Sequence, residues 1–365
     1  MLQPEYLAVP MDRRQLLRYS PSFLVASTAT LAVPLSSAFA APPRNRNGDP
    51  SAALLVPQTG PYAALGRSME RAAMLAQAGN DKSPLLVLDT GGSAEGAAAA
   101  AAAARKKGVS LILGPLRSME VPAVLAQTGG GIPVVTFSND AALRESGAFV
   151  FGITAHQSVE AILTYAAGRG IRRVAVGGVG DEADDAWTAQ VRMAAEAQSI
   201  GLGLTVMPMA QDGSVPATFP QSEDGLPDAV LMADPAALAR MTPELAARNI
   251  QPLAAFSELD LLPAMISQLE GTWLAAPDPG AFTDFARAFE QRMGTRPDII
   301  AGLAFDASNM INTMRLGGGV DRSAILSSGG FKGVCGHVRF RENGSAARAL
   351  TVLALEAGGI RKIAG

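Results

Sequence analysis

Short apolar runs of strand length alternate with segments of helical period along most of this 365-residue chain. The first two runs cover 52–56 and 85–88, and the segment between them places Leu65, Met69 and Ala72 at helical spacing. Strands that alternate with helices in this way favour parallel sheets whose faces are covered by helices. The sequence therefore predicts an α/β fold.

The alternation falls into two successive groups, which indicates two lobes. Further strands at 110–113 and 132–136 extend the first group, and after a connection at 149–153 the rhythm restarts. In the second group we expect strands at 173–176, 204–207, 229–232, 253–256 and 272–276, and helices at 159–167, 186–198 and 236–248. Long helices at 281–293 and 299–314 should return to the first lobe, and a hairpin of 336–340 with 350–355 should end the chain on the second. Lobe 1 is thus expected to comprise 51–150 plus 277–330, and lobe 2 to comprise 151–276 plus 331–365.

The N-terminus has the features of an export signal. An Arg-Arg pair at 13–14 precedes an apolar run at 23–35, and a small-residue pattern at 38–40 closes it. The run is too short for a spanning helix. We expect cleavage after Ala40, a flexible leader at 41–50 and a periplasmic location. The paired arginines resemble a twin-arginine signal, with ordinary Sec export as the alternative. The segment has no cysteine to acylate, so a lipoprotein is not expected.

Composition excludes several classes of function. The formal net charge is −3 and the chain has no run of lysines or arginines, unlike a nucleic-acid binder. Cys335 is the single cysteine, so no intramolecular disulfide can form. His156 and His337 are the only histidines, and no G-x-S-x-G elbow is present for either to serve. The sequence therefore gives no reason to expect an enzyme.

The segment from 178 to 185 contains two apparent motifs, neither of which we interpret as a ligand site. Gly178 to Ala183 fits the spacing of a dinucleotide-binding loop, but acids stand where a pyrophosphate would lie. The acids Asp181, Glu182, Asp184 and Asp185 offer oxygen ligands for a hard cation, and the alternative is a solvated loop with helix-capping acids. We favour the solvated loop and expect no metal and no cofactor.

Two loops that follow expected strands of the first lobe are candidates for a ligand site. Ser118 follows the strand at 110–113, and Ser138, Asn139 and Asp140 follow the strand at 132–136. Ligands of open parallel sheets bind beyond the carboxyl ends of the strands, where helix N-termini offer N–H groups. A carboxylate between the loops would accept several hydrogen bonds. The alternative is that Ser118 and Asp140 are helix N-caps.

Three motifs together resemble a known family. They are Leu55 to Gly66 (LVPQTGPYAALG), Ile112 to Pro115 (ILGP) followed by Ser118, and Ile132 to Val135 (IPVV). In this order they are similar to the type 1 periplasmic-binding proteins of the leucine/isoleucine/valine-binding kind. The resemblance implies two α/β lobes that close on a small polar ligand, an amino acid or related molecule. It also implies that the protein is the substrate-binding component of an ABC importer with an inner-membrane permease as partner.

The same resemblance implies roles for individual residues. Ser118 and the stretch Ser138, Asn139 and Asp140 would hold the carboxylate of the ligand. Glu258 falls where the family places the acid that pairs with the ligand's ammonium. Asp184 stands where amino-acid binders often carry an aromatic residue near the ligand.

The stretch 134–140 (VVTFSND) is also similar to a branch of this family known as penicillin-binding-protein activators. Proteins of that branch share the fold and regulate cell-wall synthases. The resemblance therefore implies a second possible partner, a cell-wall synthase. The sequence leaves the choice between importer component and regulator open.

Overall fold

The structure is a computed structural model that describes residues 51–78, 84–179, 186–197, 200–209, 219–220, 225–255 and 265–365. The chain divides into two units, Met1–Ala41 and Pro42–Gly365, and every described residue belongs to the second. The expected signal peptide and leader lie outside the described residues. No described helix is long and apolar enough to cross a membrane.

The first sheet has five strands, all parallel, in the order β2-β1-β3-β4-β5. Its strands are β1 (Ala52–Val56), β2 (Leu86–Asp89), β3 (Leu111–Leu113), β4 (Val134–Thr136) and β5 (Phe149–Val150). Central strands β1, β3 and β4 are buried along their whole length, as in a sheet covered on both faces.

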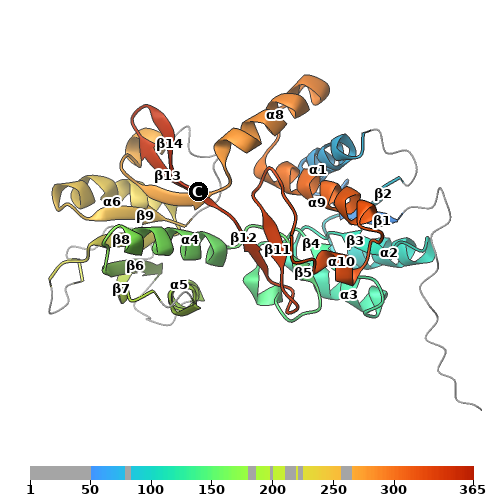
Figure 1. The fold of residues 1–365 in the computed structure, drawn as a ribbon, viewed down its shortest axis with the longest axis horizontal. Coiled ribbons are helices and arrows are strands. Elements are labelled where there is room, and N and C mark those ends of the chain that lie inside the picture. The colour runs from blue at the N-terminus through green and yellow to red at the C-terminus, as the bar shows by residue number, and fades with distance from the viewer. Residues whose placement is uncertain are drawn as a thin grey trace, which may run out of the picture. The chain divides into compact units, whose positions relative to one another are not determined.

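Alternate residues of β1 serve two different cores. Leu54 and Val56 pack with α1 (Ala63–Ala76), α8 (Pro279–Met293) and α9 (Ile299–Leu316), which cover one face of the first sheet. Ala53 and Leu55 pack on the other face with α2 (Ala94–Lys106) and α3 (Val121–Thr128). The alternation follows from the two-residue period of a strand. Figure 1 shows α1 and α9 side by side on the first sheet.

The second sheet has seven strands in the order β14-β13-β10-β9-β8-β6-β7. Its parallel strands are β6 (Arg173–Val179), β7 (Gly203–Met209), β8 (Ala229–Met232), β9 (Gln251–Ala254) and β10 (Trp273–Ala276). The last two strands, β13 (Thr351–Glu356) and β14 (Gly359–Ala364), pair antiparallel. Helices α4 (Ala155–Gly168) and α5 (Ala186–Ala197) cover one face, and α6 (Pro235–Ala247) covers the other (Figure 1). The predicted class, two mostly parallel sheets flanked by helices, is confirmed.

The C-terminal hairpin differs from the expected one. Strand β11 (Val338–Phe340) pairs with β12 (Ala346–Arg348), and not with 350–355, most of which lies in β13 (Thr351–Glu356) of the second sheet. The predicted pairing was wrong because 350–355 is apolar enough to be buried in a sheet core. Phe331, Phe340 and Ala346, which we expected in lobe 2, are buried in the core of the first sheet with Phe149 of β5. The short helix α10 (Arg322–Ile325) joins the same core through Ile325.

Candidate functional site

The loops that follow β3 and β4 meet at one edge of the first sheet. The two strands are neighbours and parallel, so their carboxyl ends point the same way. The carbonyl oxygen of Pro115 accepts hydrogen bonds from Thr136 Oγ1 at 2.8 Å and from the backbone N–H of Phe137 at 3.0 Å. The two loops are therefore joined directly through Pro115.

Ser118 begins the 3₁₀ helix η1 (Ser118–Glu120), and Arg117 occupies the cap position. The suggestion that Ser118 is a helix N-cap was therefore wrong. The turn is held by Glu120, whose Oε2 accepts a hydrogen bond from the Arg117 backbone N–H at 3.0 Å. Burial raises the pKa of Glu120, against the lowering effect of hydrogen bonds from Arg117 and Thr90 and of the Arg117 charge. The Ser118 side chain is partly exposed.

Ser138 is buried, with 4% of its surface exposed, and its Oγ accepts a hydrogen bond from the backbone N–H of Asp140 at 3.1 Å. A hydroxyl that accepts a hydrogen bond can also donate one. Asp140 caps η2 (Ala141–Leu143), because its Oδ1 accepts from the Ala142 N–H at 2.9 Å. The capping interpretation of Asp140 is therefore confirmed. Asn139 is exposed.

The positively charged side chain of Arg117 lies at the same edge. Arg117 Nη1 donates to the carbonyl oxygen of Gly92 at 3.0 Å, and its guanidinium carbon is 4.7 Å from the centroid of the Tyr62 ring. These contacts join the loops that follow β1, β2 and β3. Arg117 therefore places a positive charge one residue from Ser118, where a bound carboxylate would gain from it.

Asp89 fixes the loop between β1 and α1 at this edge. Its carboxylate accepts hydrogen bonds from the backbone N–H groups of Gln58 and Gly91 and from Thr59 Oγ1, the last at 2.6 Å. Burial is the largest single influence and raises the pKa of Asp89. Hydrogen bonds from Thr59, Gly91 and Gln58 outweigh it, so the pKa lies below its ordinary value.

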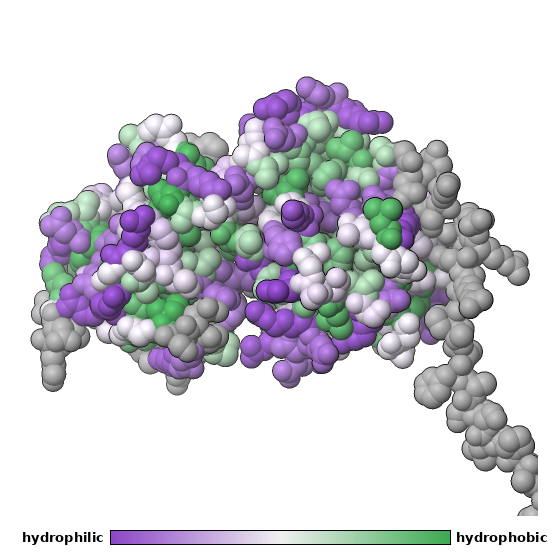
Figure 2. Space-filling view, viewed as in Figure 1, coloured by the Kyte–Doolittle hydropathy of each residue, from purple (hydrophilic) through white to green (hydrophobic). Residues whose placement is uncertain are grey.

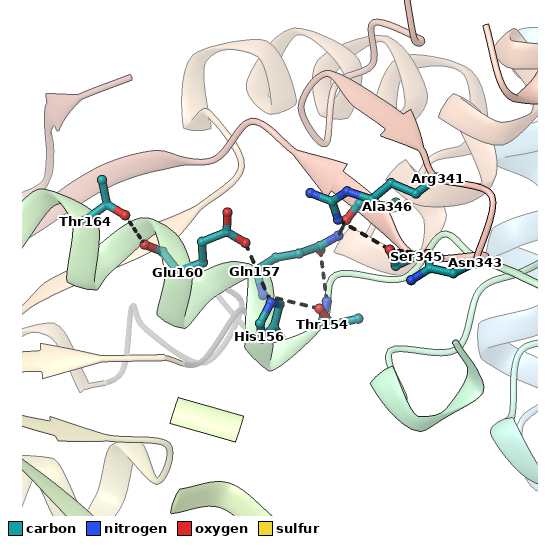
Figure 3. A network of polar contacts seen from close by, with 9 residues as sticks. All are labelled: Thr154, His156, Gln157, Glu160, Thr164, Arg341, Asn343, Ser345 and Ala346. Carbon is teal, nitrogen blue, oxygen red and sulfur yellow. Dashed lines mark hydrogen bonds and ion pairs between the residues drawn. The ribbon is translucent and has the colours of Figure 1, made fainter. Parts of the chain in front are cut away.

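A cavity of about 450 Å³ lies beyond η2. Its wall comes from η2, the start of α4, α5 and the turn between β11 and β12. The lining residues are Ala141, Ala142, Arg144, Val150, Thr154, His156, Gln157, Ala189, Met193, Arg341, Asn343, Ser345 and Ala346. Figure 3 shows the first turn of α4 facing the β11–β12 turn, with Gln157 reaching across to Ala346.

A family model described as periplasmic binding protein matches residues 51–359 of this chain. The chain belongs to the periplasmic binding protein family. Members of this family act by binding and not by catalysis, so the expectation of a non-enzymatic binding protein is confirmed. The family description also places such proteins in the periplasm. No curated sequence gives a significant match to this chain.

Solved structures share the fold of this binding protein at low identity. A protein described as a branched-chain amino acid ABC transporter from Rhodospirillum rubrum has 22% identity and a TM-score of 0.71, over 86% of this chain and 100% of that chain. The leucine-binding protein LivK of Thermotoga maritima has 19% identity and a TM-score of 0.56, over 86% and 97%. The C-domain of Haemophilus influenzae LpoA, described as a regulator of PBP1A, has 17% identity and a TM-score of 0.63, over 86% and 99%.

Two of the predicted contacts of this binding protein, Asp184 and Glu258, lie outside the described residues. Within the described part, no group of His, Cys, Asp and Glu is arranged to hold a metal ion. Cys335 is buried in the first core, as a small apolar residue would be, and burial raises the pKa of its thiol well above the usual value. His337 is exposed at the start of the hairpin, and its Nε2 lies 2.8 Å from the Gly329 carbonyl oxygen.

The sequence did not allow us to predict this cavity. Arg144, His156 and Arg341 come from three separate segments, and no motif or spacing links them. We interpreted His156 only as a surface residue at a helix start. It is the second residue of α4, as expected, but it is partly buried and lines the cavity.

Proposed function

We propose that this protein is the substrate-binding component of an ABC importer for an amino acid or a related small polar molecule. The observation that carries the proposal is the junction of the β3 and β4 loops through Pro115, which brings the segments of Ser118 and Ser138 to one edge of a parallel sheet. Ligands of open α/β sheets bind at such edges. The similarity to structures described as an ABC transporter and a leucine-binding protein supports the same function.

In this proposal the first lobe binds the carboxylate of the ligand. Ser118 and Ser138 donate hydroxyl hydrogen bonds, Asn139 contributes its amide, and Arg117 supplies a positive charge nearby. Asp140 contributes without direct contact to the ligand, because its carboxylate is engaged as the cap of η2. Charge-assisted hydrogen bonds to a carboxylate are among the stronger polar contacts in proteins.

The second lobe contributes the contacts that the family resemblance implies. Glu258 pairs with an ammonium group and Asp184 lies near the ligand. Glu258→Gln is expected to weaken binding of an amino acid by about 1.5 to 3 kcal/mol, the range of a hydrogen bond to a charged group. Unchanged affinity in calorimetry would remove Glu258 from the site.

A thermal-shift screen tests whether a small-molecule site is present. The mature protein is heated with each member of a panel of amino acids and small carboxylates. A ligand at 100 times its dissociation constant stabilises the folded state by about 2.7 kcal/mol, which is a readily measured shift. The importer proposal predicts a shift with at least one member. A flat response across the panel, with capture of a cell-wall synthase from membranes, would reject it.

The alternative function is that of a regulator that binds a cell-wall synthase. It is favoured by the similarity to the C-domain of LpoA, which is described as a regulator of PBP1A. A protein partner would need a contact surface, and the face drawn in Figure 2 has its hydrophobic residues in small groups among hydrophilic ones. Exposed large apolar side chains of the described residues include Tyr62, Met74, Met119, Met193 and Leu316.

Export follows the N-terminal signal in this proposal, with cleavage after Ala40 and no lipid anchor. If the twin-arginine route is used, replacing Arg13 and Arg14 by lysine should leave the precursor in the cytoplasm. Normal secretion of that variant would assign the protein to the Sec route. N-terminal sequencing of the mature protein should give Ala41 as the first residue.

A further inference from the structure

We propose that the cavity between η2, α4, α5 and the β11–β12 turn is a second binding site, specific for a small organic carboxylate with an apolar body. None of Ser118, Ser138, Asn139 and Asp140 lines it. The cavity is therefore separate from the first-lobe ligand contacts that the family resemblance implies. The inference stands on the residues of this cavity and does not depend on the proposed import function.

The charge of the lining is one-sided. Three of the lining residues, Arg144, His156 and Arg341, are basic, and none of the described residues that line the cavity is acidic. A pocket lined by one sign of charge concentrates ions of the opposite sign, because its low-dielectric walls focus the field. The structure thus favours an anion as the occupant.

Both arginines are available to bind such an anion. Neither Arg144 nor Arg341 forms an ion pair with an acid of the described part of the chain. Arg144 Nη2 lies 4.0 Å from the sulfur of Met193, and Arg341 Nη1 lies 3.4 Å from Ser345 Oγ. These are weak contacts for a guanidinium, whose planar N–H groups match a carboxylate in a two-pronged geometry.

The first turn of α4 adds to the positive field. Thr154 and His156 line the cavity at the N-terminus of this 14-residue helix, where the helix dipole is positive. Burial lowers the pKa of His156; Glu160, whose Oε2 is 3.8 Å from Nε2, raises it, and the charges of Arg144 and Arg341 lower it. The pKa of His156 lies below its ordinary value, so the positive field comes from the two arginines and the helix dipole.

The remaining wall selects for an apolar body. It consists of small or apolar residues, namely Ala141, Ala142, Val150, Ala189, Met193 and Ala346. A volume of about 450 Å³ lies in the range of pockets that hold small organic ligands and is larger than an inorganic anion needs. An aromatic or branched aliphatic carboxylate fits this combination of charge, size and apolar lining.

The test uses probes that differ only in charge. Benzoate, phenylacetate and isovalerate are each titrated into the mature protein by calorimetry, beside their neutral amides and at constant ionic strength. We expect at least one carboxylate to bind in preference to its amide. Arg144→Gln and Arg341→Gln should each weaken that binding by roughly tenfold or more, the loss of one charge-assisted contact. The matched control is Arg339→Gln, which removes an exposed arginine of β11 that does not line the cavity.

Two further variants separate this site from the first-lobe edge. Ala142→Phe places a ring in the cavity without changing charge and should also weaken carboxylate binding. Ser118→Ala combined with Ser138→Ala should leave it unchanged. The inference is overturned if no carboxylate binds better than its amide, or if binding survives the arginine variants. Loss of binding only in the double serine variant would place the carboxylate at the sheet edge, overturning the inference while supporting the proposed function.

Discussion

Gln157 Nε2 donates a hydrogen bond of 2.7 Å to the backbone carbonyl oxygen of Ala346, which joins the first turn of α4 to β12 across 189 positions of the chain. The same Gln157 side chain accepts from the Thr154 backbone N–H at 3.1 Å, and Thr154 Oγ1 accepts from the Gln157 N–H at 3.3 Å. This reciprocal pair is a capping box. One buried glutamine therefore both starts α4 and attaches it to the hairpin.

The first prediction concerns this junction. Thr154→Ala should lower the free energy of unfolding by about 1 kcal/mol, as expected for a lost N-cap. Gln157→Ala should cost more, about 1 to 3 kcal/mol, because it leaves buried backbone groups without partners. Urea denaturation measures both. The control Thr164→Ala removes an exposed side chain from the same helix and should change stability by less than about 0.5 kcal/mol. Equal effects of all three would contradict the account of the junction.

A pair of helical glycines gives the second prediction. A Cβ at Gly66 of α1 would lie 1.9 Å from the Pro57 carbonyl oxygen, whereas a Cβ at Gly168 of α4 would meet nothing within 4 Å. Alanine is the better helix former by about 1 kcal/mol. Gly168→Ala should therefore raise the melting temperature slightly, and Gly66→Ala should lower it because the loop after β1 must move. A Gly66→Ala variant as stable as the native chain would show that the close approach is absent.

Much of the fold could be predicted from the sequence, because apolar runs and helix starts carry local information. Strands β1 and β8 match the expected ranges 52–56 and 229–232 at both ends. Strand β9 begins at Gln251, earlier than predicted, because pairing with β8 and β10 overrides the low strand preference of Gln251 and Pro252.

The sites were less predictable than the fold. Strand order brings the loops of Ser118 and Ser138 together, and parallel pairing made that foreseeable. The cavity depends on tertiary packing of segments far apart in the sequence, and no local pattern places Arg144 and Arg341 in the lining of one cavity. The hairpin pairing failed for a related reason, since β13 pairs with β10 and β14 in the second sheet, and β11 pairs with the short segment β12.

The third prediction concerns a buried acid of α9. Asp306 accepts backbone hydrogen bonds from Val334 at 2.7 Å and Cys335 at 2.8 Å, and Arg348 Nη1 donates to the Cys335 carbonyl oxygen at 2.9 Å. Burial raises the pKa of Asp306, against hydrogen bonds from Cys335 and Val334 and the Arg348 charge. Asp306→Asn should lower stability by about 2 kcal/mol, because an amide nitrogen replaces one acceptor.

The exposed Asp284→Asn change is the control for Asp306→Asn. Among the described residues Asp284 pairs only with Arg287 on the surface of α8, with side chains 79% and 64% exposed, so its loss should be close to neutral. Chemical denaturation of both variants decides the matter. Equal stabilities would mean that the Asp306 hydrogen bonds contribute nothing net.

Acid sensitivity provides the fourth prediction. The hydrogen bond from the Arg173 side chain is the main cause that lowers the pKa of Asp228 below 3.8, despite an opposing effect of burial, and the Arg172 and Arg173 N–H groups add to it. A depressed folded-state pKa stabilises the protein above the unfolded value, and this contribution is lost as the pH falls through the folded-state pKa. Asp228→Asn should therefore flatten the loss of stability below about pH 4. The prediction would be contradicted if the stability of the native protein and that of Asp228→Asn fell equally steeply with pH in this acid range.

The central claim is that a ligand binds at the carboxyl ends of β3 and β4. Calorimetry with a ligand found by thermal shift tests this claim most directly. The measurement compares the native chain, Ser118→Ala combined with Ser138→Ala, and the control Ser146→Ala, which removes a comparable turn hydrogen bond to the Ala148 N–H. We predict that the double variant folds, within about 1 to 2 kcal/mol of the native stability, and binds at least about tenfold more weakly. The control should bind normally. Native affinity in the double variant would contradict the claim.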